Sequence, residues 1–458
     1  MGFTTSFFLF VFLPVVLLCF YLIKNQYKRY LLLIASLVFY VWGSPKAIFI
    51  FIFAALVDYF LGRLIYTSNG KAKKFFAFLG IAGNIGLLAY FKYANFFIET
   101  ANKVSKSNFP LRELIVPIGI SYFTFSGISY LIDIYRRDIE PETNIWNFIL
   151  YMCMFQKITA GPIVRYGTVS DQLGCRKVSM EDILSGSRRF CIGLAKKVLV
   201  ADQLGVIADE IFTIMPAQNL TATAWLGMIS YTLQIYYDFS GYSDMAIGLA
   251  RMCGFRFQEN FDYPYISKSL TEFWRRWHIS LSTWFRDYLY IPLGGNRRGN
   301  VYFNSAVVFL ATGLWHGASW HFVFWGIWHG AFLIFEKFMR KHSKIYVPNI
   351  VKHLYTLLAV AIGWVFFRCD SLTMGLQYTK RLFGIGGQAA GFTLKWYLSP
   401  KIIIILVAAV IFSIPISKKI KSKIKNNIWI NLICLLLLAC SIVCVMSSTY
   451  NSFIYFKF

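Results

Sequence analysis

The chain has 458 residues, of which 57% are hydrophobic and 15% are charged, and its formal net charge is +25. Soluble domains usually carry about 25% charged residues, so this composition excludes an ordinary soluble protein. The basic residues stand in short clusters between apolar runs, at Lys24–Arg29, Lys71–Lys74 and Lys418–Lys425. Such clusters are typical of cytoplasmic loops between membrane helices. They explain the charge better than nucleic-acid binding does, so we expect no nucleic-acid partner.

Apolar stretches follow one another along the chain, and about 20 helical residues suffice to cross the core of a bilayer. The first stretch, Thr5–Ile23, has neither a basic start nor a cleavage site, so we expect a retained helix and not a signal peptide. Hydropathy predicts helices near residues 4–23, 30–43, 46–66, 75–92, 113–134, 144–160, 221–250, 302–318, 320–338, 353–367, 400–416 and 428–447. We therefore predict an all-α, multi-pass protein in the lipid bilayer, with one domain over residues 1–458.

The stretch between about residues 255 and 300 has lower hydropathy but keeps many aromatic residues. Within residues 271–290, large apolar side chains recur every three or four positions, which predicts one amphipathic helix. These side chains are Trp277, Leu281, Trp284 and Tyr288. Arginines on the same stretch suit an interface or the wall of a water-filled cavity better than a lipid-crossing helix. A basic, glycine-rich turn follows at residues 293–299.

Three histidines are candidates for chemistry. His316 ends a run of small and apolar residues, and an ionisable group at membrane depth is costly, so function is the default hypothesis. Burial keeps an imidazole neutral, which is the form that a general base needs. The alternative is a histidine that only forms hydrogen bonds between helices. His278 could likewise be functional, or it could only pack among tryptophan rings. His329, which lies in a second Trp-His-Gly triplet, is the third candidate.

Other catalytic motifs are absent from the sequence. It contains no Gly-x-Ser-x-Gly, HExxH, P-loop or CxxC pattern, which argues against a serine hydrolase, a zinc protease or an ATPase. The nine cysteines are scattered along the chain, so we expect neither a disulfide framework nor a metal site.

Several blocks of the sequence resemble the membrane-bound O-acyltransferase (MBOAT) family, in particular its alginate, peptidoglycan and exopolysaccharide O-acetylation branch. The blocks occur in the family's order between about residues 40 and 385. They are 117–125 (PIGISYFTF), 160–166 (AGPIVRY), 237–244 (YDFSGYSD), 273–299, 314–317 (LWHG) and 364–368 (WVFFR). Each block alone is a weak signal, but their combination and order are specific.

The resemblance implies a ring of roughly a dozen transmembrane helices around a central funnel, with short interfacial or re-entrant helices and a catalytic core at about residues 110–370. It implies that His316 is the essential histidine and that His278 is the second functional position. It also implies acetyl-CoA as the acyl-donor substrate, with no permanently bound cofactor. The resemblance further implies a polysaccharide acceptor, an extracytoplasmic acetyltransferase partner protein and a location in the bacterial inner membrane.

These expectations lead to a mechanism in which His316 is the general base and His278 orients the acyl acceptor or stabilises the oxyanion. Further residues are candidates for lining the pocket or contacting the donor. They are Trp274, Arg275, Arg276, Trp277, Ser282, Arg286, Asp287, Arg297, Arg298, Trp315 and His329. Phosphate contacts and anchoring at the interface are both open for four of the arginines, namely Arg275, Arg276, Arg297 and Arg298.

Two other functions remain open from the sequence. The first is D-alanyl transfer to teichoic acid from a carrier protein, which another branch of the same family performs. The second is transport without catalysis, with the polar centre as the substrate path. Transporters of this size often contain two similar halves, and the sequence contains no such repeat.

Overall fold

The computed structural model describes residues 2–174, 177–214, 218–386, 391–416, 427–447 and 450 of the chain. Every regular element within these ranges is a helix, which confirms the predicted all-α class. The basic cluster Lys418–Lys425 lies outside the described residues.

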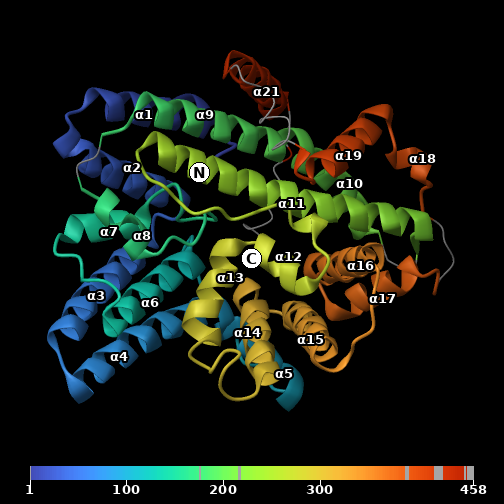
Figure 1. Cartoon of the computed structure of the whole chain (residues 1–458), viewed down its shortest axis with the longest axis horizontal. Helices are drawn as coiled ribbons and strands as arrows, with labels where there is room; N and C mark the ends of the chain where they lie inside the picture. The colour runs from blue at the N-terminus through green and yellow to red at the C-terminus, as the bar shows by residue number, and fades with distance from the viewer. Residues whose placement is uncertain are drawn as a thin grey trace. The chain divides into compact units, whose positions relative to one another are not determined.

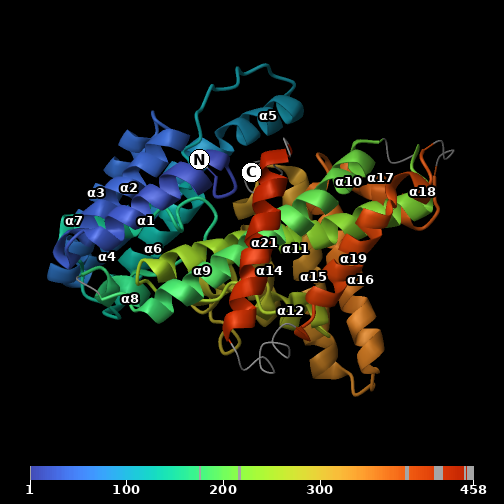
Figure 2. The same ribbon diagram turned by 90° about the horizontal axis from the view of Figure 1, so that it is seen from above.

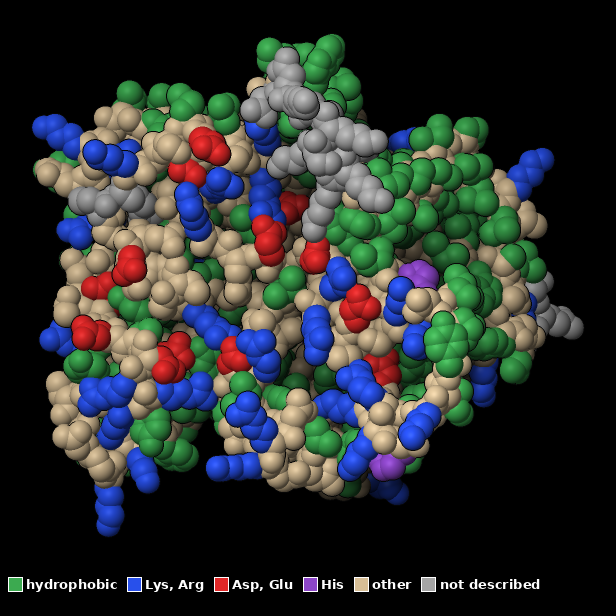
Figure 3. All heavy atoms as spheres, viewed as in Figure 1, with side chains coloured by type: hydrophobic (Ala, Val, Ile, Leu, Met, Phe, Trp, Pro, Cys, Tyr) green, Lys and Arg blue, Asp and Glu red, His purple; other side chains and the backbone are tan. Residues whose placement is uncertain are grey.

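Long apolar helices identify the chain as a multi-pass membrane protein. Within the described ranges, four helical stretches are long and apolar enough to cross a membrane: Ile48–Thr67, Gly70–Ser105, Asn349–Arg368 and Ile428–Ser447. Phe8–Leu22 and Pro400–Phe412 are shorter apolar helices. The second of these, α19, exposes Ile404, Val407 and Val410, and Figure 3 shows hydrophobic side chains gathered there. An exposed surface of this kind suits lipid and not water.

The structure comprises two compact units. The first unit comprises Met1–Phe190 and Met245–Gln258, and the second comprises Cys191–Asp244 and Glu259–Phe458. Two long helices, α9 (Met180–Ala195) and α11 (Thr221–Met252), contribute residues to both. The prediction of one domain over the whole chain stays a prediction.

The first unit is built from the N-terminal helices, in which α3, α4 and α6 pack together and α7 packs on α2 and α3 (Figure 1). Its elements are η1 (Phe8–Phe12), α1 (Leu13–Leu22), η2 (Asn25–Tyr27), α2 (Lys28–Gly43), α3 (Ile48–Thr67), α4 (Gly70–Leu88), η3 (Ala89–Tyr93), α5 (Ala94–Ser105), α6 (Ile120–Arg136), α7 (Ile145–Cys153), α8 (Tyr166–Val169) and η4 (Ser170–Gln172).

Three predicted boundaries in this unit differ from the structure. The helix predicted at 75–92 starts at Gly70 and continues through η3 and α5 to Ser105, and Figure 2 shows α5 apart from α1 to α4. The helix predicted at 113–134 begins only at Ile120, because Gly119 before it is left-handed, with φ 71°. The helix predicted at 144–160 ends at Cys153, where Met154 leaves helical geometry.

The second unit contains the aromatic core. Its elements are η5 (Lys196–Ala201), α10 (Asp202–Thr213), η7 (Pro264–Ile266), α12 (Leu270–Arg276), α13 (Ile279–Phe285), η8 (Arg286–Tyr290), α14 (Val301–His316), α15 (Trp320–His342), α16 (Asn349–Arg368), α17 (Leu372–Leu382), α18 (Leu394–Tyr397), α19 (Pro400–Phe412) and α21 (Asn427–Ser447). Helix α15 packs against α14, α16 and α12, so it lies at the middle of this group. Large buried side chains, including Trp325, Trp364 and Tyr378, fill the space between these helices.

The amphipathic helix predicted over residues 271–290 is broken in the structure. Helix α12 ends at Arg276, Trp277 is extended, and His278 adopts a left-handed conformation with φ 44° before α13 begins. A left-handed backbone costs a non-glycine residue about 1–2 kcal/mol. Such conformations persist where the surrounding structure enforces them, and they cluster at functional sites. The break therefore marks His278 as a position of interest.

The start of α12 is fixed by a residue far along the chain. The Glu336 carboxylate on α15 accepts hydrogen bonds from the backbone N–H groups of Leu270 (2.5 Å) and Thr271 (3.1 Å). Ser269 Oγ accepts another from Glu272 N, at 3.0 Å. A carboxylate at a helix N-terminus satisfies free N–H groups and complements the helix dipole. This contact ties α12, and the break after it, to α15.

Candidate active site

The three candidate histidines lie together in the second unit, connected by a chain of aromatic contacts. His278 lies 6.1 Å from the ring of Trp315, and Trp315 lies 4.9 Å from His316. His316 and His329 each lie 4.9 Å from Trp325. The exposed fractions of His278, His316 and His329 are only 1%, 6% and 0%. The predicted residues Trp315 and His329 thus join the two predicted catalytic histidines in one buried cluster.

His316 is the last residue of α14, and two glycines determine how close this helix end comes to α15. Gly313 and Gly326 face each other, and a methyl group on either one would come within about 3.2 Å of the Cα of the other. Without side chains at these positions, the two helices approach closely enough for His316 to contact Trp325 from the neighbouring helix. Phe367 on α16 contacts the His316 ring as well, at 5.2 Å.

His278 is held at the break between α12 and α13 by polar groups on one side and rings on the other. Its Nδ1 lies 3.2 Å from Asn260 Oδ1 and 3.4 Å from Ser280 Oγ. The Phe239 ring meets it edge-on at 4.6 Å. Burial lowers the pKa of His278 to about 3. The imidazole is therefore neutral at physiological pH.

His329 is enclosed by rings and not by polar groups. Trp274 and Trp325 contact it edge-on at 5.1 and 4.9 Å. A Cβ atom added at Gly363 of α16 would come 2.5 Å from its Nε2, so the imidazole lies directly over this glycine. Neither ring nitrogen has a hydrogen-bond partner in the described part of the chain. A buried imidazole without partners is unusual, which keeps His329 as a candidate lining residue.

A pocket of about 210 Å³ adjoins this cluster. Of the predicted residues, Trp274, Arg275, Ser282 and Arg286 line it. The others in its wall are Thr271, Leu281, Phe285, Tyr290, Ser305, Val308, Phe309, Thr312, Leu333 and Lys337. Trp274 connects the pocket to the cluster, because its ring also contacts His329. Thr312 lies one helical turn before His316 on α14.

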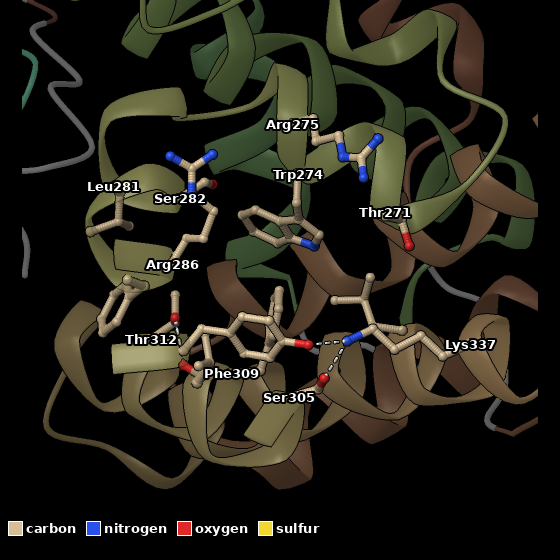
Figure 4. A pocket seen from close by; sticks show the side chains of 14 residues that line it. Thr271, Trp274, Arg275, Leu281, Ser282, Arg286, Ser305, Phe309, Thr312 and Lys337 are labelled. Carbon is tan, nitrogen blue, oxygen red and sulfur yellow. Dashed lines mark hydrogen bonds between the residues drawn. The ribbon is translucent and has the colours of Figure 1, made fainter. Parts of the chain in front are cut away.

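Cationic side chains surround the otherwise largely apolar pocket. Lys337 Nζ donates hydrogen bonds to Ser305 Oγ (2.6 Å) and Tyr290 Oη (3.0 Å), which holds the ammonium at the pocket wall (Figure 4). Arg275 and Arg286 are both exposed where they border the pocket. In Figure 4, Trp274 lies between these residues and those of α14, such as Phe309. The pocket therefore combines an apolar interior with several positive charges.

The remaining predicted residues lie outside this pocket wall. Arg276 forms ion pairs with Glu272 (3.0 Å) and Asp262 (3.1 Å), and Asp287 pairs with Arg286 at 2.6 Å. Trp277 belongs to the aromatic core, 4.8 Å from Trp364. Arg297 and Arg298 are exposed in the turn before α14. The donor-contact role of these residues stays a prediction.

Two polar residues on which the argument below depends, Asn260 and Lys337, were not predicted from the sequence. Asn260 lies 18 positions before the histidine that it contacts, and Lys337 lies more than two turns beyond His329 on α15. No periodicity or motif links such positions. In the described ranges, no group of three or more His, Cys, Asp or Glu side chains could hold a metal ion.

The fold and this site define a multi-pass membrane protein that buries neutral imidazole among aromatic rings, beside a cationic pocket. A model of the membrane-bound O-acyltransferase (MBOAT) family matches residues 85–379 of the chain. This match covers more than half of the sequence and both histidines that the resemblance singled out. The chain belongs to the membrane-bound O-acyltransferase family and is an O-acyltransferase.

Individual relatives agree with the family match. The chain is 44% identical over 395 residues to the probable alginate O-acetylase AlgI of Pseudomonas syringae pv. tomato, covering 84% of this chain and 76% of that protein. It is 34% identical over 424 residues to the peptidoglycan O-acetyltransferase of Helicobacter pylori, covering 84% and 80%. It is 28% identical over 273 residues to the teichoic acid D-alanyltransferase of Bacillus subtilis, covering 56% and 68%.

Proposed function

We propose that this protein transfers an acetyl group from acetyl-CoA to hydroxyl groups of a polysaccharide that is exported or displayed at the cell surface. The observation that carries the proposal is the buried cluster of His278, His316 and His329 next to a cationic pocket. The similarity to alginate and peptidoglycan O-acetyltransferases supports acetyl as the acyl group and a polysaccharide as its acceptor.

The reaction needs a base because a sugar hydroxyl is a weak nucleophile near neutral pH. His316 takes the proton as the hydroxyl oxygen attacks the thioester carbonyl, which contributes roughly 10²–10⁴-fold to the rate. The C–S bond then breaks, the new C–O ester bond remains, and His316 returns the proton to the leaving thiolate. Apolar surroundings such as the rings of Trp325 and Phe367 strengthen electrostatic interactions in the transition state.

The pocket suits an acyl donor that carries phosphates on a long, weakly polar arm. Arg275, Arg286 and Lys337 are the cations at its wall, and guanidinium and ammonium groups bind phosphate oxygens strongly. The largely apolar interior suits the arm that carries the thioester. On this proposal acetyl-CoA is a substrate that enters and leaves, and no cofactor stays bound.

The cellular arrangement follows from the same proposal. The chain lies in the bacterial inner membrane and receives acetyl-CoA from the cytosol, where this donor is made. Its acyl acceptor lies in or beyond the membrane, and a separate extracytoplasmic acetyltransferase protein assists the transfer to the polysaccharide.

The decisive measurement is the O-acetyl content of surface polysaccharide, released by mild base, in cells with wild-type protein, a deletion or His316→Ala at equal protein level. Loss in both altered strains is expected. If O-acetyl content falls only in the deletion strain, the protein is still needed for acetylation, but His316 is not the base. Unchanged acetyl content in both would overturn the proposal, and base-released D-alanine or transport by reconstituted vesicles would then identify the function.

D-alanyl transfer is the less favoured alternative. The match to the Bacillus subtilis teichoic acid D-alanyltransferase covers 56% of the chain at 28% identity, against 84% at 44% for the alginate O-acetylase. Labelled acetyl-CoA and a labelled D-alanyl carrier protein, offered separately to the purified protein, distinguish the two donors.

A further inference from the structure

A buried asparagine, Asn260, supports His278 through its side chain and its backbone. Its Oδ1 accepts hydrogen bonds from the backbone N–H of Ser280 (3.2 Å) and from Ser280 Oγ (2.9 Å). Its Nδ2 donates to Ser243 Oγ on α11, at 3.0 Å. Its backbone carbonyl accepts from Ile279 N, at 2.9 Å. Asn260 is 1% exposed, so this geometry is shielded from water.

The orientation of the Asn260 amide follows from these partners. A backbone N–H group can only donate, so the atom that receives the Ser280 N–H must be the carbonyl oxygen of the amide. The same oxygen lies 3.2 Å from His278 Nδ1. A carbonyl oxygen can only accept, and Nδ1 of His278 must therefore carry the proton in this hydrogen bond.

The proton on Nδ1 determines what the other ring nitrogen can do. In a neutral imidazole only one nitrogen is protonated, so Nε2 of His278 carries a lone pair. Burial keeps the pKa of His278 low and the ring neutral. Nε2 is itself buried and has no hydrogen-bond partner in the described part of the chain. A buried acceptor without a partner is costly, and a substrate hydroxyl would supply one.

We propose that Asn260 is a positioning residue that holds His278 with Nε2 as a hydrogen-bond acceptor, so that His278 binds a hydroxyl group of the acyl acceptor. This inference rests on the proposed function and decides between the two roles open to His278. An unprotonated nitrogen cannot donate to an oxyanion, so His278 orients the acyl acceptor. On a sugar, the reacting hydroxyl donates its proton to His316 while a neighbouring hydroxyl donates a hydrogen bond to His278.

The tautomer itself is the most direct test, because it is independent of activity. The full chain is labelled with 15N-histidine, placed in lipid nanodiscs and examined by NMR, and His278→Gln assigns the signals of His278. We expect a protonated Nδ1 and an unprotonated Nε2 in the wild type. Asn260→Leu should lose this preference, whereas Asn260→Asp should keep the proton on Nδ1. A protonated Nε2 in the neutral wild-type ring, or an unchanged spectrum in Asn260→Leu, overturns the inference.

Acetylation in cells provides the second readout, at equal protein level. Asn260→Leu should lower O-acetyl content at least tenfold, and Asn260→Asp, which retains the oxygen that accepts from Nδ1, should restore most of it. Asn219→Leu is the matched control, because Asn219 is also fully buried in the same unit but donates to Ile211 O, away from the histidines. Wild-type acetylation with Asn260→Leu overturns the positioning role. If deletion of the protein leaves acetylation unchanged, the proposed function fails, and the NMR result still decides the tautomer.

Discussion

His316 and His329 lie on neighbouring helices and pack against the same indole ring, that of Trp325, at a ring-centroid distance of 4.9 Å in each case. Trp325 is 0% exposed and also contacts Trp364 and Phe367 of α16. One side chain of α15 thus positions a histidine of its own helix relative to the histidine that ends α14.

Replacing Trp325 should therefore impair both stability and activity. Trp325→Ala leaves a large cavity between α14, α15 and α16, and such substitutions cost about 3–5 kcal/mol. Acetyl transfer per folded molecule should fall at least tenfold, because His316 loses the wall that orients it, and Trp325→Phe should lie in between. Thermal unfolding and O-acetyl content measure the two effects. The control is Trp396→Ala, since Trp396 is 67% exposed; a Trp325→Ala protein with normal transfer would contradict the argument.

Lys337 tests whether the pocket binds the acyl donor. Lys337→Met keeps the aliphatic stem but removes the ammonium that Ser305 and Tyr290 hold at the pocket wall. The KM for acetyl-CoA should rise roughly tenfold, the scale of one charge-assisted hydrogen bond, while kcat changes little. Thiol release from acetyl-CoA by the purified protein provides both constants. Lys341→Met on the same helix, at an exposed position outside the pocket, is the matched control. Equal KM values for the two variants would show that the pocket does not bind the acyl donor.

The sequence predicts the fold class and the helices well, because burial in lipid leaves a strong apolar signal in α3, α16 and α21. Helix ends are predicted less well where a single residue decides them. Gly119 delays the start of α6, and the left-handed His278 divides the amphipathic stretch in two. A helical spacing of Trp277, Leu281 and Trp284 persists across that break, so periodicity alone could not reveal it.

The histidines of the site could be predicted, whereas their partners could not. An imidazole in an apolar run is conspicuous in a sequence, and His316, His278 and His329 are found together in the structure. Asn260 lies between α11 and η7, and only the folded chain brings it to His278 at the start of α13. Long-range hydrogen bonds of this kind depend on tertiary packing, and local patterns carry no information about them.

The low pKa of His278 makes the stability of the protein depend on pH. His278 lies between two seven-residue helices, and burial lowers its pKa from 6.5 to about 3. Below pH 6.5 the unfolded chain binds a proton that the folded chain does not, so stability is lost as pH falls from about 6.5 towards 3. The loss reaches at most about 1.4 kcal/mol per pH unit from this residue. Thermal unfolding between pH 7.5 and 4.5 should show a smaller decline for His278→Gln than for the wild type. If the variant and the wild type show the same pH dependence of stability, a group other than His278 causes it.

The close approach of α14 and α15 should depend on Gly326. A methyl group at this position would come within 3.2 Å of Gly313 Cα and would also collide with the carbonyl oxygen of Phe309, which is backbone and cannot move away. Overpacking of this kind typically costs about 1–3 kcal/mol.

Gly326→Ala should therefore lower the unfolding temperature and reduce acetyl transfer several-fold, because His316 ends the helix that is pushed aside. Gly86→Ala on α4 is the control, since a Cβ atom there meets no protein atom within 4 Å, and alanine is the better helix former. Stability and transfer are measured for both variants at equal protein level. If Gly326→Ala behaves like Gly86→Ala, the two helices tolerate a wider separation, and the position of His316 does not depend on their close contact.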